Sequence, residues 1–302
     1  MATLDPAPLT FAAQGALALA CAAAAGGPRP ARIAVALGLA GMLAMPYTLA
    51  PEHFTLRGFS ALFALMFVIR GSDLLRERPR PLLERLVHAC SIADLRLAAR
   101  VAPNVRVRLL VTGVACALLA TPPLMVAAAA PEIAEPWPLL QRWGCGTIGF
   151  YLSFEAIDRL ARVLYGLVGF EVEPGQRMPI AARTIAEFWG IRWNSIVRRW
   201  LSAVAFLPLA RRGRPVVGGL LAFALSALIH AYLLLPAVGV RAAALMGGFF
   251  LLQGVFVAIE RALGVARWPR PLGHAWTIVL FLASVPLFLD PLLQVFGFAP
   301  MI

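Results

Sequence analysis

The sequence is poor in charged residues and has no lysine. Charged residues make up 14% of its 302 positions, whereas a soluble domain carries about 25%. Apolar residues account for 61% of the chain, and the mean hydropathy is +0.80. This balance excludes a soluble globular enzyme, a disordered tail and a coiled coil. It predicts a helical protein that crosses a membrane several times.

Cysteine is scarce, and the common catalytic signatures are missing. The four cysteines show no paired spacing and three lie in apolar runs, so we expect small core residues rather than a disulfide framework or a metal site. No HExxH, GxSxG or phosphate-loop pattern occurs. The sequence therefore predicts neither a metal ion nor a cofactor. The cysteines are Cys21, Cys90, Cys116 and Cys145.

All 27 basic residues are arginine, and against 15 acidic residues they give a net charge of +12. In a soluble protein such an excess indicates nucleic acid, but here the arginines lie in loops between apolar runs. There they orient the chain and meet anionic headgroups, so we expect membrane lipids and no nucleic acid as partners. Arginine without lysine, with much alanine, glycine and proline, is typical of a GC-rich bacterial genome and suggests a bacterial inner membrane.

The apolar runs predict an all-α, polytopic integral membrane bundle, since about 20 apolar residues cross a bilayer as a helix. We expect about eight transmembrane helices, in a range of about seven to nine, within a single membrane domain over residues 1–302. The segment Leu82–Arg100 has helical periodicity with mixed charge, which predicts an interfacial amphipathic helix. The expected spans are 9–26, 32–50, 56–70, 107–130, 143–170, 215–236, 240–262 and 273–297.

The arginines also predict how these spans are oriented. The loops 27–32, 70–108, 171–214 and 261–270 hold 22 of the 27 arginines (two, nine, eight and three). Because basic loops stay on the cytoplasmic side, both chain termini are expected on the opposite face.

The segment Pro179–Phe206 contains three tryptophans within twelve residues. At helical spacing, Trp189, Trp193 and Trp200 fall on one bulky apolar stripe, and Asn194 lies on the neighbouring stripe. This pattern predicts an amphipathic helix with aromatic anchors at the membrane interface. A surface helix with no further role fits the same pattern.

His230 is a histidine deep within an apolar run. If the span begins near Pro215, His230 lies 15 residues in, which is about 22 Å along a helix. Ionisable groups at such depth are expensive and normally face a cavity or a partner, and Ser226 stands four residues earlier on the same face. A site residue and a neutral histidine bonded to a neighbouring helix both fit this position.

Together, the two stretches resemble the wax synthase-like branch of the membrane-bound O-acyltransferase superfamily. That branch carries the signature P-x-x-A-x-(S/T)-L-x-(D/E)-F-W-G-R-R-W-N, matched here from Pro179 to Asn194. It also carries F-x-x-S-G-x-x-H-E in the next span, matched here from Phe223 to Ala231. The family motifs thus lie within residues 171–302.

Three positions depart from the pattern of this branch. Ile191 stands where an arginine is usual, and Ala227 replaces the usual glycine. Ala231 replaces the acidic residue that commonly follows the histidine. The first two changes can tune packing or acceptor shape. The third removes a group that would orient His230, a task that then falls to Ser226 or to a water.

The resemblance implies an O-acyltransferase that uses acyl-CoA, with His230 as general base and Asn194 as its polar partner. The thioester is already activated, so the reaction requires no metal, and acyl-CoA is a co-substrate rather than a cofactor. The implied acceptor is a lipophilic alcohol: a fatty alcohol, or a terpenoid, sterol or polyketide alcohol. The residues expected to bind substrate or acyl-CoA are Trp189, Arg192, Trp193, Arg198 and Ser226.

Two other functions also fit the sequence. In a membrane transporter, a path would be lined by His230, by the charged pairs Glu155 with Arg159 and Asp158 with Arg162, and by Gly247–Gly248, although no inverted repeat supports one. In a non-catalytic scaffold that keeps the fold, Ala231 would mark the loss of the reaction. Replacement of His230 would then change no chemistry.

Overall fold

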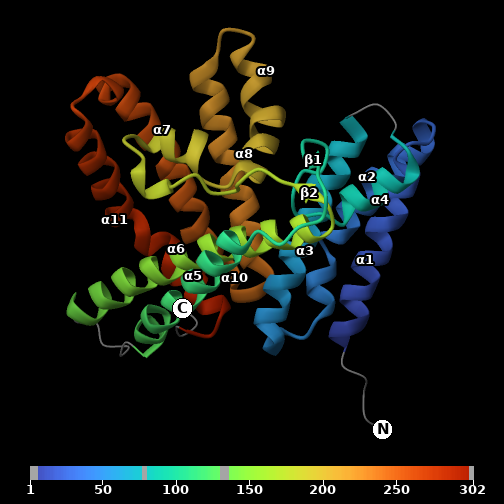
Figure 1. The fold of residues 1–302 in the computed structure, drawn as a ribbon, viewed down its shortest axis with the longest axis horizontal. Helices are drawn as coiled ribbons and strands as arrows, with labels where there is room; N and C mark the ends of the chain where they lie inside the picture. The colour runs from blue at the N-terminus through green and yellow to red at the C-terminus, as the bar shows by residue number, and fades with distance from the viewer. Residues whose placement is uncertain (1–5, 77–79, 130–135, 299–302) are drawn as a thin grey trace. The chain divides into compact units, whose positions relative to one another are not determined.

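The computed structural model describes residues 6–76, 80–129 and 136–298, and nearly all of its regular structure is helical (Figure 1). This confirms the prediction of an all-α protein. One short antiparallel ladder joins β1, Ala99–Arg100, to β2, Phe170–Glu171.

The chain divides into two compact units. The first contains Met1–Arg96 and Ala231–Ala243, and the second contains Leu97–His230 and Ala244–Ile302. The first unit includes α1 (Pro6–Ala24), α2 (Arg29–Met42), the short 3₁₀ segments η1 (Met45–Thr48) and η2 (Pro51–His53), α3 (Phe54–Arg76) and α4 (Leu82–Ala89). The second includes α5 (Val107–Ala129), α6 (Pro136–Leu167), the segments η3 to α9 within Pro179–Ala210, the 3₁₀ segment η6 (Val265–Arg267) and α11 (Arg270–Val295). Helix α10 (Pro215–Leu263) contributes to both units, and the single domain expected from the sequence stays a prediction.

Five helices in the described part of the chain are long and apolar enough to cross a membrane, namely α1, α3, α5, α10 and α11. The protein is therefore an integral membrane protein built from helices. Helix α10 has 49 residues, about 74 Å, which is more than twice the hydrocarbon core of about 30 Å. Gly239 interrupts it with φ 87° and ψ −176°, so the expected spans 215–236 and 240–262 lie on either side of this break.

Two expected spans are not among these five helices. Helix α2, which covers part of 32–50, has only 14 residues. Helix α6, which covers most of 143–170, has 32 residues but carries several charged side chains. The number of about eight spans stays a prediction.

A small residue lets α1 and α2 pack closely in the first unit. A Cβ at Gly38 of α2 would stand only 2.9 Å from Sγ of Cys21 on α1. Cys21 is buried, as expected for a small core residue, whereas Cys116 and Cys145 are half-buried. Cys90 is exposed, and all four thiols are free.

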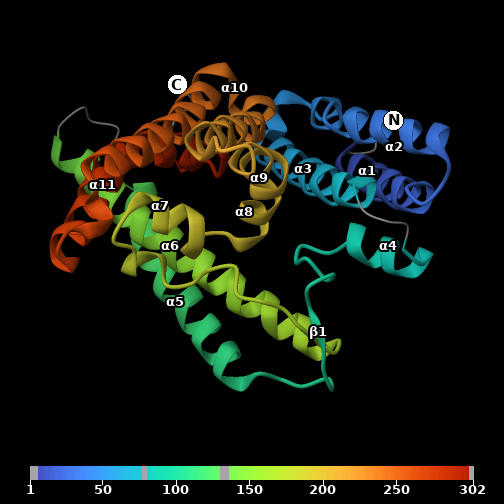
Figure 2. The same cartoon turned by 90° about the horizontal axis from the view of Figure 1, so that it is seen from above.

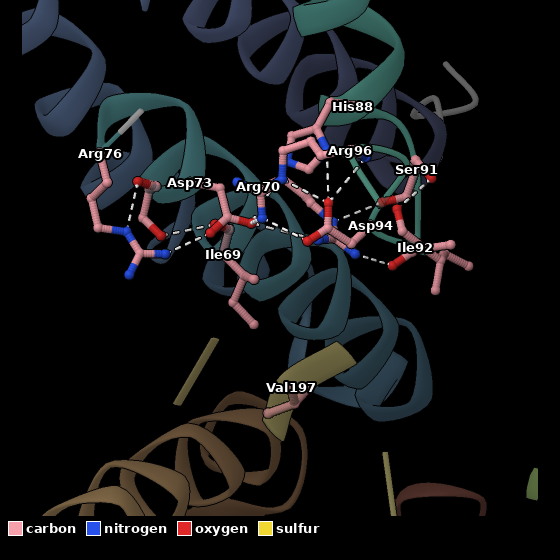
Figure 3. A network of polar contacts seen from close by, with 12 residues as sticks. Ile69, Arg70, Asp73, Arg76, His88, Ser91, Ile92, Asp94, Arg96 and Val197 are labelled. Atoms are coloured by element: carbon pink, nitrogen blue, oxygen red, sulfur yellow. Dashed lines mark hydrogen bonds and ion pairs between the residues drawn. The ribbon is translucent and has the colours of Figure 1, made fainter. Parts of the chain in front are cut away.

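A buried network of charges ties α3 to the segment that follows α4, as Figure 3 shows. Asp73 of α3 lies 3.0 Å from Nη2 of Arg96, and Arg96 contacts both carboxylate oxygens of Asp94 at 2.6 Å. The ring nitrogens of His88 lie 3.6 Å from Asp73 and 3.9 Å from Asp94. Arg70 of α3 donates from Nε to a backbone carbonyl of the same segment at 3.0 Å. The network thus fixes residues 91–96 on the end of α3.

The pKa of Asp94 is lowered in this network. Burial alone would raise it, but the hydrogen bond from Arg96 and the charges of Arg96 and Arg70 outweigh burial. The stabilisation by Asp94 is therefore present above the unfolded pKa of 3.8, and it is lost as the pH falls through the lower folded pKa.

Replacing Asp94 by asparagine is expected to lower the free energy of unfolding by about 1–3 kcal/mol, because Arg96 loses a charged bidentate partner. Thermal unfolding in detergent, followed by size-exclusion chromatography, should show a lower melting temperature. Glu84→Gln is the control, because Glu84 pairs with Arg80 at the surface. Such pairs contribute below about 1 kcal/mol. A melting temperature unchanged by Asp94→Asn would contradict the role of the network.

In the second unit, α5 and α6 lie side by side (Figure 1, Figure 2). Gly149 permits this approach, because a Cβ there would stand 2.6 Å from a leucine side chain of α5. The expected pair of Glu155 with Arg159 forms within α6. Asp158 of α6 accepts a hydrogen bond from the backbone N–H of Gly175 at 2.6 Å. This bond anchors the loop that leads into the segment Pro179–Phe206, which is called the signature segment below.

Candidate active site

The segment Pro179–Phe206 is not the continuous amphipathic helix that its spacing predicts. Between two helical stretches, Trp193 is extended and Asn194 adopts the left-handed conformation with φ 40° and ψ 69°. Asparagine tolerates this conformation better than most residues, and helical periodicity carries no sign of it. The segment folds into η3 (Pro179–Ala181), α7 (Ile185–Glu187), the π-helix η4 (Phe188–Arg192), α8 (Ser195–Leu201), the π-helix η5 (Ser202–Phe206) and then α9 (Leu207–Ala210).

Asn194 caps the first turn of α8. Its Oδ1 accepts a hydrogen bond from the backbone N–H of Val197 at 3.2 Å, and its own backbone N–H donates to Gln176 at 3.4 Å. Its side-chain nitrogen has no hydrogen-bond partner among the residues that the structure describes. Because the cap occupies Oδ1, the two amide hydrogens remain available to an oxygen of a bound molecule.

Glu260 of α10 holds the beginning of α7 in place. This carboxylate is buried, and its two oxygens accept the backbone N–H groups of Ile185 and Ala186 at 2.8 and 2.6 Å. It thereby satisfies backbone donors that a helix start leaves without partners. Glu260 stands 75 residues after Ile185, so local patterns give no sign of the contact.

Arg192, expected to bind acyl-CoA, is engaged within its own segment. Its Nη2 lies 2.7 Å from Oε1 of Glu187, and its Nη1 donates to the carbonyls of Arg177 and Met178 at 3.0 and 3.2 Å. Burial would raise the pKa of Glu187, but hydrogen bonds from the backbone of Arg183 and the side chain of Arg192 lower it. Arg192 thus stabilises this turn, and the structure does not bring it to the cavity.

A cavity of about 420 Å³ lies within the second unit, between the signature segment and two parts of α10. Its volume falls in the range of small-molecule sites, about 300–1,000 Å³. Its walls are mainly apolar, and they also include Phe223 and Phe250. Six of the seven residues expected in the site line it: Trp189, Trp193, Asn194, Arg198, Ser226 and His230.

His230 is oriented by its own helix. Its ring stacks on Phe250 with the ring centroids 3.8 Å apart. Its Nδ1 lies 2.8 Å from the backbone carbonyl of Ser226 and 3.4 Å from the Ser226 hydroxyl. A carbonyl oxygen only accepts, so Nδ1 carries the proton of the neutral ring and Nε2 keeps a free lone pair. The backbone carbonyl of Ser226 therefore orients the ring of His230, which the alanine at position 231 cannot do.

Two arginines at the cavity form no ion pair within residues 6–76, 80–129 and 136–298. Nε of Arg198 is buried without a hydrogen-bond partner in this part of the chain. Burial lowers the pKa of Arg198, and the nearby charges of Arg199 and Arg177 lower it further. Arg261 lines the cavity from the end of α10 and is exposed. Anionic groups bound here would pair with these guanidinium groups.

Sequence reasoning missed three residues around this cavity. Phe250 is one apolar residue among many, so no pattern singles it out. Arg261 looks like one more loop cation that orients the chain. Glu260 offers the one detectable signal, because a carboxylate that ends an apolar run is expensive to bury and needs a partner.

Comparison with known proteins finds similarity to acyltransferases in the part of the chain that carries the sequence motifs. Residues 173–252 match the membrane bound O-acyl transferase family. The chain is 32% identical over 162 residues to probable long-chain-alcohol O-fatty-acyltransferase 2 of Arabidopsis thaliana, which is 49% of this chain and 47% of that protein. It is 30% identical over 143 residues to long-chain-alcohol O-fatty-acyltransferase of Simmondsia chinensis, which is 43% of this chain and 41% of that protein. It is 30% identical over 188 residues to acetyltransferase ple2 of Rhodocybe pseudopiperita, which is 51% of this chain and 48% of that protein.

The long apolar helices make this an integral membrane protein, and the cavity beside the segment Pro179–Phe206 is its candidate site. Residues 173–252 are similar to the membrane bound O-acyl transferase family, and the relatives named long-chain-alcohol O-fatty-acyltransferase are similar to about half of this chain. The matched region spans somewhat less than half the length of each of these relatives.

Proposed function

We propose that this protein is a membrane-embedded O-acyltransferase that moves an acyl group from acyl-CoA to the hydroxyl of a lipophilic alcohol. The observation that carries this proposal is the cavity that His230 and Asn194 line together. Relatives named for transfer of a fatty acyl group to a long-chain alcohol support the same reaction class.

In this mechanism the alcohol oxygen attacks the carbonyl carbon of the thioester while Nε2 of His230 takes the hydroxyl proton. The new C–O bond forms, the C–S bond breaks, and the imidazolium returns its proton to the departing thiolate. The products are an ester and free CoA. A neutral imidazole is an effective base near neutral pH. The amide hydrogens of Asn194 stabilise the carbonyl oxygen as it gains negative charge.

The separation along α10 between Phe250 and Arg261, which both line the cavity, suits a thioester carrier. Arg261 lies 11 residues after Phe250, the stacking partner of His230, which is about 17 Å along α10. Acyl-CoA has phosphates at one end and a thioester at the other, joined by a long arm. Phosphates at Arg198 and Arg261 with the thioester at His230 therefore fit one donor molecule.

The cavity walls favour an apolar acceptor. Gly190 and Gly219 line the cavity, and a Cβ at either position would meet no other heavy atom within 4 Å. The open space beside them accommodates a substrate, and the mainly apolar surroundings select a lipophilic one. Fatty alcohols and terpenoid, sterol or polyketide alcohols belong to this class.

The proposal extends to the arrangement in the membrane. About eight spans result when both parts of α10 cross the bilayer and α2 and α6 cross as well. The arginine-rich loops then face the cytoplasm, where acyl-CoA is available. We propose that the protein lies in the inner membrane of a bacterium, which the use of arginine in place of lysine throughout the chain supports.

An acyl-transfer assay on the purified protein in nanodiscs tests this function. Acetyl-CoA and palmitoyl-CoA are offered with fatty alcohols, sterols, terpenoid alcohols and diacylglycerol, and products are read by mass spectrometry. We expect an ester whose mass identifies donor and acceptor together, with release of one CoA per ester. Uptake of a solute into vesicles without any ester or CoA release would instead favour a transporter.

Ser226→Ala is expected to lower the rate of ester formation by less than about tenfold. The reason is that the shorter contact of His230, at 2.8 Å, is to the backbone carbonyl of Ser226, which alanine retains. Only the longer contact to the hydroxyl, at 3.4 Å, is lost. Initial rates of the two proteins, measured side by side, check this. A loss as large as that of His230→Ala would show that the hydroxyl itself is required.

A further inference from the structure

Trp189 forms the cavity wall beside the stacking partner of His230. Its ring centroid lies 5.3 Å from that of Phe250, and 6.2 and 6.4 Å from those of Phe249 and Phe223. Phe250 in turn stacks on His230. A shift of the indole would therefore move the surface on which the histidine rests.

A chain of hydrogen bonds runs behind this indole. Gln253 of α10 is fully buried, and its Oε1 accepts a hydrogen bond from Nε1–H of Trp189 at 3.3 Å. Its Nε2 donates to the hydroxyl of Ser284 on α11 at 3.0 Å. The Ser284 hydroxyl donates to the backbone carbonyl of Leu280 at 2.8 Å. The chain thus links the cavity wall to α10 and α11.

The hydrogen bonds of this chain can run in one direction only. The single hydrogen of the Ser284 hydroxyl goes to backbone carbonyls of its own helix, so toward Gln253 this oxygen must accept. The amide nitrogen of Gln253 therefore faces Ser284, and the amide oxygen faces Trp189. The indole has one donor, and this oxygen receives it.

A buried amide in a transmembrane helix is unfavourable unless its polar atoms are paired. A methionine of similar size at position 253 would fill the space without that penalty. A fully paired network adds something that an apolar residue does not, namely one fixed orientation of the groups that it joins. Here the group at the cavity end is the indole of Trp189.

We propose that Gln253, held by Ser284, is a positioning residue that fixes the Trp189 indole and thereby sets the rate and the acceptor selectivity of acyl transfer. This inference rests on the function proposed above. Without Gln253 the indole N–H has no acceptor and turns from its place, so the space beside His230 changes shape. Misplacement of reacting groups by about 1 Å can lower a rate about 100-fold.

A double-mutant cycle tests this role. Gln253→Met, Trp189→Phe and the double variant are assayed in nanodiscs with one acyl-CoA and two alcohols, one straight and one polycyclic. We expect Gln253→Met to lower kcat/KM by about 10- to 100-fold, and unequally for the two alcohols. In the Trp189→Phe background, which lacks the indole N–H, the same change is expected to have less than about a twofold effect.

Two changes on α11 complete the experiment. Ser284→Ala removes the partner that orients Gln253, so we expect a change of selectivity in the same direction as Gln253→Met. Thr277→Val is the matched control, because Thr277 is also buried on α11 and its hydroxyl bonds the carbonyl of Gly273 at 3.0 Å. Its selectivity between the two alcohols is expected to equal that of the wild type.

The outcomes separate this inference from the function on which it rests. A wild-type protein that forms no ester with any alcohol overturns the proposed function, and this role with it. An active wild type whose Gln253→Met variant keeps its rate and selectivity overturns the role of Gln253 alone. An equal loss with and without the indole of Trp189 also overturns it, because Gln253 would then act on the bundle as a whole.

Discussion

Replacing His230 by alanine is expected to lower ester formation by about 10²- to 10⁴-fold, which is the usual contribution of a general acid–base. In the proposed mechanism the alcohol loses the group that takes its proton, whereas Arg198 and Arg261, the proposed contacts of the donor, remain at the cavity. The loss should therefore fall on kcat, with KM for acyl-CoA nearly unchanged. Initial rates over a range of donor concentrations, read as ester by mass spectrometry, separate the two constants.

His53→Ala is the matched control for this substitution. His53 belongs to η2 of the first unit and does not line the cavity, so its replacement is expected to leave the rate unchanged. Equal yield and equal elution of both variants from size-exclusion chromatography would show that membrane insertion is intact. Full activity of His230→Ala would contradict the assignment of the base.

Those parts of the fold that depend on local signals could be predicted from the sequence. The length of the apolar runs gave the helices, and the break in α10 at Gly239 falls where the sequence separates 215–236 from 240–262. Glycine permits the positive φ found there, so the residue itself carries the signal. The break at Asn194 was missed, because it depends on a distant partner, Gln176, and on a cap that helical periodicity does not reveal.

For the candidate site, the sequence predicted the motif residues but not the contacts that hold them in place. The motif positions Trp189, Asn194 and His230 could be named from the sequence, and the structure brings them to one cavity. What holds them there comes from contacts between residues far apart in the chain. Gln253 stands 64 residues from Trp189, and Glu260 75 residues from Ile185. No periodicity spans such separations, so these supports required the packed structure.

Asn194→Asp is expected to lower kcat by about 10²- to 10³-fold, the usual effect of removing one donor to a developing oxyanion. Aspartate keeps an oxygen that can cap α8 by accepting from Val197, and it is similarly tolerated in the left-handed conformation. Aspartate has an acceptor oxygen in place of the two amide hydrogens. Its negative charge lies where, in the proposed mechanism, the carbonyl oxygen gains negative charge. The rate of ester formation at saturating acyl-CoA measures this loss.

Asn194→Gly separates the chemistry of this residue from its role in the fold. Glycine adopts the left-handed conformation freely but has neither the capping oxygen nor the amide hydrogens. If the amide hydrogens stabilise the transition state, the aspartate and glycine variants should both lose about 10²- to 10³-fold in kcat. If Asn194 only caps α8, the aspartate variant should stay active and the glycine variant should lose stability. Asn104→Asp controls for the added charge, because the side-chain amide of Asn104 donates to the nearby carbonyl of Ala102 and does not belong to the cavity lining.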